Sequence, residues 1–172
     1  MTTLLLVRHG ETDWNAEGRL QGHTDRPLND YGRHQATVLA EELAAREIAA
    51  VYASDLARAR ETAEIVAARF GLPVALDVDL REKNWGSWEG LTPSERDRVD
   101  YEGESTEAHR ERVLRSVYRI GERHAGEQVI VVTHGGSLRR VQAAVLGMAL
   151  PVAANCSVWE CGYEDGALTP ID

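Results

Sequence analysis

The sequence predicts a three-layer α/β/α sandwich with a mostly parallel central sheet. Short apolar runs alternate along the chain with stretches whose apolar residues recur at helical spacing. The runs at 4–7 and 129–132 are apolar throughout, which is typical of parallel strands that are buried on both faces. The 172 residues contain no internal repeat and no low-complexity linker, so we expect one domain over residues 1–172.

Each expected strand is a short apolar run that a turn former ends. The first run, 4–9, stops at Gly10, and the run at 129–133 is soon followed by two glycines. Near the C-terminus, the pattern around Trp159 and Leu168 indicates a hairpin. The expected strands are therefore 4–9, 48–53, 74–76, 129–133 and the two arms of the terminal hairpin.

Each expected helix carries apolar residues three or four positions apart, which places them on one face. The first begins at Asp30 and ends near Arg46, after a long polar loop over 10–29 that is itself typical of a functional segment. Ser54 or Asp55 is expected to cap the second. This second helix is expected to end at about Phe70. A third helix is expected from Ser105 or Thr106 to Ile120, and a fourth from Ser137 to Leu146.

Composition and charge argue against a nucleic-acid or membrane partner. The net charge is −9, which disfavours binding to nucleic acid or to an anionic membrane surface. No run approaches the ~18 apolar residues of a membrane span. The residues before Leu4 include neither a basic region nor a cleavage site of small residues, so we expect a cytoplasmic protein.

Neither a disulfide nor a metal site is expected. Cys156 and Cys161 are five positions apart in a strand-like stretch, where alternation would place them on opposite faces, so free thiols are expected. The six histidines show no paired spacing of the kind that binds metals.

Two strand ends carry the chemistry. Arg8-His9-Gly10 ends the first strand, and Thr133-His134-Gly135-Gly136 ends a later one. In parallel sheets ligands bind beyond the carboxyl ends of the strands, where glycine lets the backbone approach closely. A single histidine there could equally be structural. Two such ends, one with an adjacent arginine, favour a site for a phosphoryl group.

Two further charged residues are candidates with open alternatives. Arg58 follows the second strand in the first turn of a helix, where the dipole favours an anion. Taken alone, it fits better a solvated arginine paired with a glutamate of the same helix. Glu82 lies in the irregular segment 79–104, where Trp85 and Trp88 would favour its proton-donor form and its basic sequence neighbours would oppose it. Glu89 is the rival carboxylate.

Three residues of the long loop, Asn15, Gln21 and Gly22, complete the candidate set. The two amides are neutral donors suited to phosphate oxygens, although isolated polar loop residues are usually just solvated.

These blocks, taken together and in order, resemble a known family. They are Arg8-His9-Gly10-Glu11-Thr12, Ser54-Asp55-Leu56 with Arg58, Arg81-Glu82 before Trp85-Gly86-Ser87-Trp88-Glu89-Gly90, and Thr133-His134-Gly135-Gly136. The chain is similar over nearly its full length to the histidine phosphatase superfamily, in its phosphoglycerate mutase-like branch. The segment 18–28 fits the same resemblance.

The resemblance implies a division of labour. His9 would be the nucleophile that forms a phosphohistidine, and Glu82 would protonate the leaving alkoxide and then deprotonate the attacking water. The phosphoryl clamp would consist of Arg8, Arg58 and His134. Asn15, Gln21, Gly22 and Gly135 would complete the cradle. Neither a metal nor another cofactor is implied, because the arginine and histidine side chains supply the positive charge.

Within this family the chain fits a phosphatase better than a mutase. Mutases that resemble it carry a long capping segment between the acid and the second histidine, whereas residues 83–133 leave only a short loop at 91–104. Water should therefore reach the intermediate, giving a phosphomonoesterase that acts on a small phosphorylated substrate and releases inorganic phosphate. Trp14, Trp85 and the loop 91–104 are expected to shape the leaving-group site.

Several alternatives stay open. The enzyme could be a pathway-specific phosphatase for a ribazole phosphate or a sugar phosphate, or a cofactor-dependent phosphoglycerate mutase. Outside the enzymes, it could be a silent module that binds a phosphoester, although no motif residue is lost. The terminal hairpin could expose an edge to a second copy and form a homodimer, or it could simply pack in the core.

Overall fold

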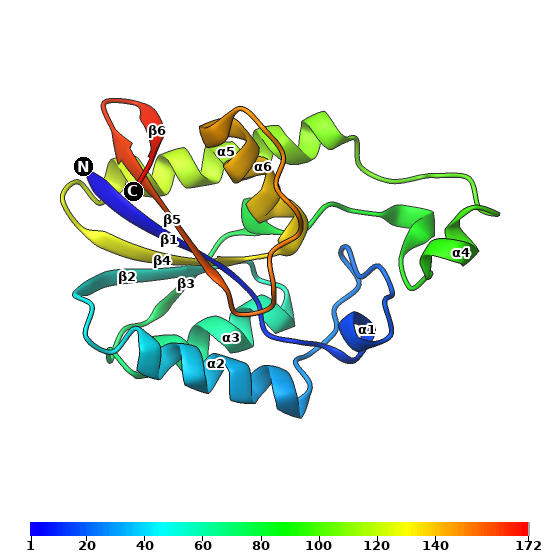
Figure 1. Cartoon of the computed structure of the whole chain (residues 1–172), viewed down its shortest axis with the longest axis horizontal. Helices are drawn as coiled ribbons and strands as arrows, with labels where there is room; N and C mark the ends of the chain where they lie inside the picture. The colour runs from blue at the N-terminus through cyan, green and yellow to red at the C-terminus, as the bar shows by residue number, and fades with distance from the viewer. Residues whose placement is uncertain (172) are drawn as a thin grey trace.

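A six-stranded sheet forms the centre of the computed structural model, which describes residues 1–171 (Figure 1). Its strand order is β3-β2-β4-β1-β5-β6; the first four are mutually parallel, and β5 and β6 are antiparallel additions at one edge. The expected mostly parallel sheet is confirmed. The strands are β1 (Thr2–Arg8), β2 (Ile48–Ala53), β3 (Val74–Leu76), β4 (Gln128–Thr133), β5 (Val158–Glu164) and β6 (Ala167–Pro170).

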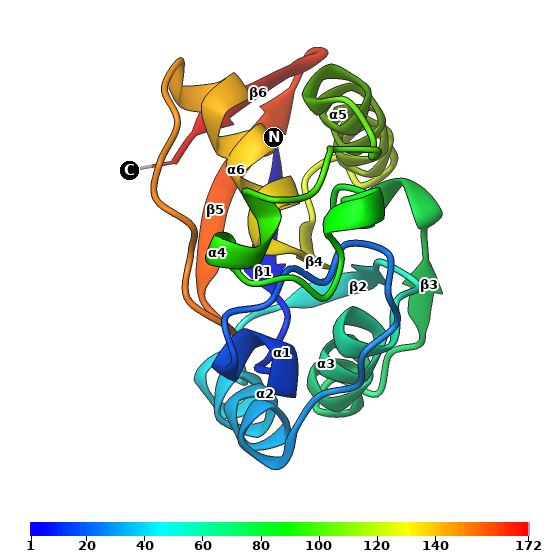
Figure 2. The ribbon, with the colours of Figure 1, turned by 90° about the vertical axis from the view of Figure 1, so that its right-hand side faces the viewer.

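Two helices cover each face of the sheet, which gives the three predicted layers (Figure 2). One face packs against α2 (Asp30–Glu42) and α3 (Ala57–Ala68), and the other against α5 (Thr106–Arg123) and α6 (Gly135–Leu146). Short helical turns complete the chain: α1 (Asp13–Ala16), η1 (Val78–Leu80), η2 (Gly86–Trp88) and α4 (Pro93–Arg96). None of the helices in the described part is long and apolar enough to cross a membrane.

The apolar run of β1 explains why this strand lies at the centre. Leu5 and Val7 pack with the core beneath α2 and α3, whereas Leu4 and Leu6 pack with the core beneath α5 and α6. All four side chains are fully buried. Because successive side chains of a strand point to opposite faces, a strand between two helical layers must be apolar at every position.

The strand register brings the two histidine-bearing ends together. β1 pairs in parallel with β4, and Arg8 lies opposite Thr133. One residue further, the amide of His9 donates a hydrogen bond to the carbonyl of Thr133 over 3.0 Å. His9 and His134 therefore leave the sheet side by side at its carboxyl edge.

Several expected helix boundaries were wrong, and tertiary contacts explain the largest difference. Neither Ser54 nor Asp55 caps α3; Leu56 holds the cap position without a side-chain hydrogen bond. The Asp55 carboxylate is taken instead by a bidentate ion pair with Arg81, over 2.7 and 2.6 Å. Asp25, from the preceding loop, accepts the free Ala57 amide over 2.7 Å.

The other boundaries differ by a few residues. Asn29 rather than Asp30 caps α2, by accepting the Gly32 amide over 2.7 Å, and the helix ends at Glu42 rather than near Arg46 because residues 43–46 close into a turn. Likewise α3 ends at Ala68 before Phe70, and α6 begins at Gly135 instead of Ser137. Of the two candidate caps of α5, Ser105 is the one used; α5 itself runs beyond Ile120 to Arg123.

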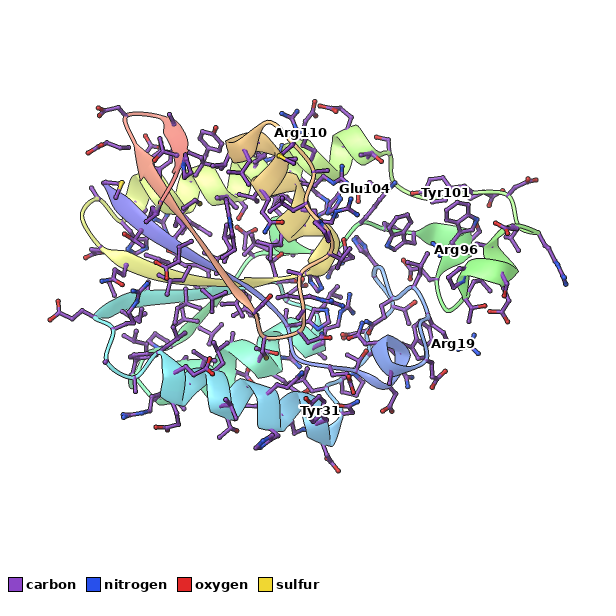
Figure 3. The ribbon with its side chains drawn as sticks, in the orientation of Figure 1. Arg19, Tyr31, Arg96, Tyr101, Glu104 and Arg110 are labelled. Carbon is purple, nitrogen blue, oxygen red and sulfur yellow. The ribbon has the colours of Figure 1, made fainter. Side chains whose placement is uncertain are left out.

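The segment between η1 and α5 projects beyond the carboxyl edge of the sheet, as Figure 3 shows for Arg96 and Tyr101. Its core is aromatic. Trp88 stacks on Trp85 with ring centroids 6.3 Å apart, and Tyr101 packs on Trp88 at 4.7 Å. The polypeptide returns to α5 at Glu104, whose carboxylate forms a bidentate ion pair with Arg112 over 2.7 and 2.8 Å.

Candidate active site

A cavity of about 260 Å³ opens at the carboxyl ends of β1 and β4. Eight of the nine candidate residues line it: Arg8, His9, Asn15, Gln21, Gly22, Arg58, Glu82 and Gly135. They come from β1, the following loop, α3, the projecting segment and the start of α6, so the fold gathers residues far apart in sequence. The ninth, His134, lies fully buried beside His9.

His9 is held as a neutral imidazole with one defined tautomer. Its Nδ1 lies 2.7 Å from the carbonyl oxygen of Gly10, which can only accept, so Nδ1 carries the proton and Nε2 keeps its lone pair. Burial, followed by the positive charges of Arg58 and Arg8, lowers the pKa of His9 well below its ordinary value. A neutral Nε2 beside two guanidinium groups is suited to attack an electrophilic phosphorus.

His134 is a buried imidazole without a protein partner in the described structure. Its ring packs edge-on against His9 with centroids 5.2 Å apart, and neither ring nitrogen has a hydrogen-bond partner among residues 1–171. Burial, and then the charge of Arg58, lowers its pKa. Buried polar atoms normally have a hydrogen-bond partner. The ring N–H of His134, which has none here, is suited to donate to a bound oxyanion.

Arg8 and Arg58 supply the positive charge. Arg58 is only 1% exposed, and its Nη2 and Nη1 donate to the carbonyls of Gly22 and Thr24 over 2.7 and 3.1 Å. Burial lowers its pKa to about 10, which leaves it cationic at neutral pH. Arg8 donates from Nη1 to the Ala153 carbonyl over 2.6 Å. The Nε of each arginine is buried without an acceptor among residues 1–171.

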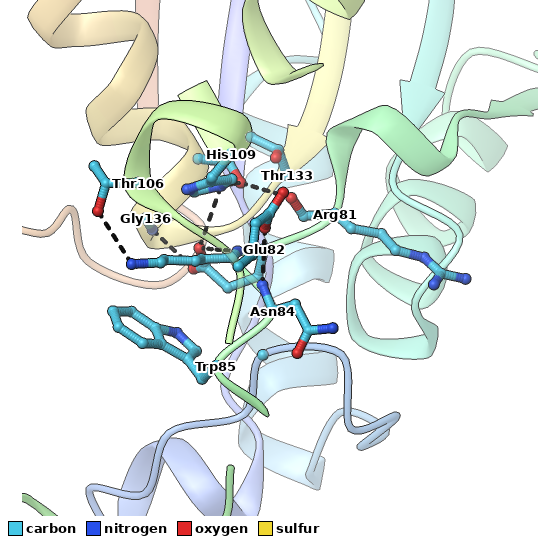
Figure 4. Close-up of polar contacts among 12 residues, drawn as sticks. Arg81, Glu82, Asn84, Trp85, Thr106, His109, Thr133 and Gly136 are labelled. Carbon is cyan, nitrogen blue, oxygen red and sulfur yellow. Dashed lines mark hydrogen bonds and ion pairs between the residues drawn. The ribbon is translucent and has the colours of Figure 1, made fainter. Parts of the chain in front are cut away.

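Glu82 is part of the site, and its rival Glu89 is not. The Glu82 carboxylate accepts the amides of Lys83 and Gly136, each over 2.8 Å, which fixes it beside the start of α6 (Figure 4). A Cβ on Gly136 would meet this carboxylate and displace it, so glycine lets Glu82 occupy this position. The carboxylate of Glu89 instead accepts hydrogen bonds from the amides of His23 and Thr24 and from the Thr24 hydroxyl.

The long loop after β1 closes one wall of the cavity. Thr12 donates from its hydroxyl to the amide oxygen of Gln21 over 2.7 Å, and Asn15 accepts the Thr12 amide with its side-chain oxygen over 3.1 Å. Both amide oxygens are thus engaged, which orients the two NH₂ groups as donors. Gly22 adopts φ +55°, a conformation that glycine favours, and presents its carbonyl to Arg58.

The sequence did not identify several residues of the site. Lys83, Thr106, His109, Arg139, Arg140 and Val152 also line the cavity. Behind it, Asn155 donates to the carbonyl of His9 over 2.9 Å and to the side-chain oxygen of Asn15 over 3.3 Å. The pair Arg139-Arg140, which follows the second histidine block after two intervening residues, was the available signal, but arginine is too frequent in this chain to single it out.

The expected leaving-group residues were only partly right. Trp85 lines the cavity, but neither Trp14 nor any residue of 91–104 does. Trp14 is drawn aside by packing against Gly90 and beneath Arg26, whose guanidinium lies 5.2 Å from its ring. Within 91–104, the Tyr101 ring packs against Trp85 and lies 5.0 Å from the Nζ of Lys83, so this loop contacts residues that line the cavity without lining it itself. Among residues 1–171, no group of three or more His, Cys, Asp or Glu side chains is arranged to hold a metal ion.

Three buried histidines should make the fold less stable as the pH falls below about 6.5. Burial lowers the folded-state pKa of His9, His134 and His109, the last to about 4. The unfolded chain then binds more protons than the folded chain below that pH, so the free energy of unfolding falls with pH until the folded pKa values are reached. Each histidine contributes at most about 1.4 kcal/mol per pH unit.

The variant His109→Gln tests this expectation, because glutamine keeps a donor for Ser137 but does not titrate. Urea unfolding between about pH 6 and pH 5, in buffer without phosphate, should show a slope of stability against pH that is smaller by roughly a quarter to a third, since burial also lowers the pKa of His23. An unchanged slope would contradict the burial effect at His109.

Comparisons with known proteins agree with this geometry. Residues 4–170 match the family model of the histidine phosphatase superfamily, branch 1. Phosphoglycerate mutase-like protein 4 of Arabidopsis thaliana is 44% identical over 79% of this chain and 67% of its own length. Metal-independent phosphoserine phosphatase of the same plant is 38% identical over 90% of this chain and 75% of its own.

A solved structure also resembles this chain closely in fold. The structure of YhfR from Bacillus stearothermophilus matches with a TM-score of 0.91 and 37% identity, covering 98% of this chain and 94% of the other. The chain therefore belongs to branch 1 of the histidine phosphatase superfamily.

Proposed function

We propose that this chain is a phosphomonoesterase that hydrolyses small phosphorylated metabolites through a phosphohistidine on His9. The observation that carries the proposal is the fixed tautomer of His9, whose Nδ1 proton is held by the Gly10 carbonyl. This leaves Nε2 unprotonated between the guanidinium groups of Arg8 and Arg58. Positioning and charge stabilisation of this kind provide most of the catalysis of phosphoryl transfer.

The first half-reaction moves the phosphoryl group to His9. Nε2 attacks phosphorus while the bond from phosphorus to the ester oxygen breaks, and Glu82, entering in its protonated form, gives its proton to the leaving alkoxide. Arg8, Arg58 and His134 stabilise the phosphoryl oxygens, with Asn15, Gln21, Gly22 and Gly135 completing the cradle. The unpartnered donors of both arginines and of His134 support this assignment.

The second half-reaction returns the enzyme to its starting state. The Glu82 carboxylate takes a proton from a water molecule, the water oxygen attacks phosphorus, and the bond from Nε2 to phosphorus breaks. Inorganic phosphate leaves and Glu82 is again protonated. The position of Glu82 at the wall of the cavity, where two backbone amides orient its carboxylate, supports its role as the base in this step.

Hydrolysis is favoured over a mutase reaction because residues 91–104 do not line the cavity, which supports access of water to the phosphohistidine. Relatives named phosphoserine phosphatase and glucosyl-3-phosphoglycerate phosphatase support small phosphorylated metabolites as the substrate class.

The cytoplasmic location and the homodimer stay predictions. The side chain of Trp159 packs against the core beneath α5 and α6.

The assay that tests the function uses the purified chain with p-nitrophenyl phosphate and with 3-phosphoglycerate. We expect release of inorganic phosphate from p-nitrophenyl phosphate without added metal, also in the presence of a chelator, and no interconversion of phosphoglycerates. Interconversion of phosphoglycerates without any phosphate release would overturn the proposal in favour of a mutase. Binding without turnover of either compound would favour the phosphoester-binding module.

A further inference from the structure

Besides Arg8 and Arg58 of the proposed phosphoryl cradle, three further cations at the cavity have no carboxylate partner among residues 1–171. Lys83, Arg139 and Arg140 all line the cavity, yet none of them forms an ion pair with a described residue. Arg19 lines the same cavity but is paired with Glu17 and Glu95, over 2.8 and 3.3 Å. In a chain of net charge −9, unpaired cations that gather at one cavity indicate an anionic ligand.

The two arginines are held by α6, a rigid element. α6 begins at Gly135, so Arg139 and Arg140 lie little more than one turn into it. Both side chains are half-buried, and the Nε of each is buried without an acceptor in the described structure. Because both side chains line the cavity, these unpaired N–H groups are available to the oxygens of a ligand bound there.

Lys83 is oriented by neutral groups. Its Nζ donates to the Thr106 hydroxyl over 3.1 Å and lies 4.7 Å from the centre of the Trp85 ring. Burial, and then the nearby charge of Arg140, lowers the pKa of Lys83, which places the two cations in one electrostatic neighbourhood. The ammonium is therefore held in place by neutral groups, and it forms no ion pair with a described carboxylate.

The nearest carboxylates do not neutralise this group. Glu104 accepts both arms of the Arg112 guanidinium, over 2.7 and 2.8 Å. Glu82 accepts two backbone amides and has the proton-transfer role in the proposed function. The positive charge of Lys83, Arg139 and Arg140 thus remains available to a ligand.

We propose that Lys83, Arg139 and Arg140 form a second anion subsite, which binds a carboxylate or a second phosphate on the leaving group of the substrate. The inference rests on the proposed function, because it requires the phosphoryl group to occupy the cradle around Arg8, His9 and Arg58. A leaving group that passes Glu82 then reaches these three cations within the same cavity. A cavity of about 260 Å³ suits a small molecule, and its two groups of cations suit one that carries two anionic groups.

A matched series of substrates tests the subsite. Propyl phosphate, 3-aminopropyl phosphate, 3-phosphonooxypropanoate and propane-1,3-diol bisphosphate share a three-carbon leaving group but end in a methyl, an ammonium, a carboxylate and a phosphate. We expect kcat/KM at least about tenfold higher for one or both anionic substrates than for propyl phosphate, and lowest for the aminopropyl ester. The kcat/KM of the bisphosphate is divided by two before the comparison, because either of its two equivalent phosphates can react.

The double variant Arg139→Gln/Arg140→Gln should lower kcat/KM for the preferred anionic substrate about tenfold more than for propyl phosphate. Arg19→Gln is the matched control, because it removes a cation of the same cavity that already has carboxylate partners. Its ratio of anionic to neutral kcat/KM should equal that of the wild type. High salt should also reduce the wild-type preference. The separate single variants guard against a double variant that fails to fold.

The outcomes separate the two proposals. Hydrolysis of all four esters at similar kcat/KM, or an anionic preference that the arginine variants retain, would overturn the second subsite and leave the proposed function standing. Failure of the wild type to release phosphate from any ester, including p-nitrophenyl phosphate, would overturn the proposed function and the subsite with it. Preference for only one anionic ester would identify whether the subsite selects carboxylate or phosphate.

Discussion

Replacing His9 by alanine is expected to reduce kcat for every phosphomonoester by at least about 10³-fold. Alanine removes the Nε2 lone pair, and no neighbouring group can replace it. His134 packs beside His9 with its ring edge-on, but it has no carbonyl partner that would fix its tautomer. The measurement is phosphate release at saturating substrate, for both p-nitrophenyl phosphate and an alkyl phosphate.

Two controls accompany the His9 variant. His34→Ala removes an exposed imidazole outside the cavity and should keep wild-type activity. Thermal unfolding should show that His9→Ala remains folded, since alanine fits the space and only one side-chain hydrogen bond is lost. Activity of a folded His9→Ala variant within tenfold of the wild type would rule out His9 as the nucleophile.

Replacing Glu82 by glutamine is expected to separate substrates by leaving group. Glutamine cannot give a proton to an alkoxide, so kcat/KM for an alkyl phosphate should fall by about 10²–10⁴-fold. The p-nitrophenolate ion is a good leaving group that needs little protonation, so kcat/KM for its phosphate should fall much less. Initial rates for the two substrates, measured with one enzyme preparation, give the comparison directly.

Glu102→Gln is the matched control for this substitution, because Glu102 is exposed and does not line the cavity. It should leave both rates unchanged. Equal losses on the alkyl and p-nitrophenyl esters in the Glu82 variant would remove the acid role and assign Glu82 to positioning of α6 through the Gly136 amide.

The sequence was sufficient for the layers and the strands, because these follow from periodicity. The uninterrupted apolar run of β1 required helices on both faces, and the structure has them. The cap of α3 could not be predicted, because Asp55 has the right residue type for a cap but its carboxylate pairs with Arg81. Local propensity is overridden wherever a distant partner offers a stronger contact.

The site was predicted where its residues lie in motifs and missed where they lie on a helix face. His9 and His134 were predicted to meet because both follow parallel strands, and the pairing of β1 with β4 brings them together. The choice between Glu82 and Glu89 needed the structure, since both carboxylates accept backbone amides and only Glu82 lines the cavity. His109 was missed because its burial depends on how α5 and α6 pack.

The most direct test of the account is the chemical identity of the phosphorylated residue. The Glu82→Gln variant should accumulate the intermediate, because glutamine cannot deprotonate the attacking water. We would mix it rapidly with ³²P-labelled p-nitrophenyl phosphate, quench in alkali and map the label by peptide analysis. The account predicts an acid-labile, alkali-stable label on the peptide that carries His9. A label on the peptide that carries His134, or an acid-stable label on any residue, would contradict it.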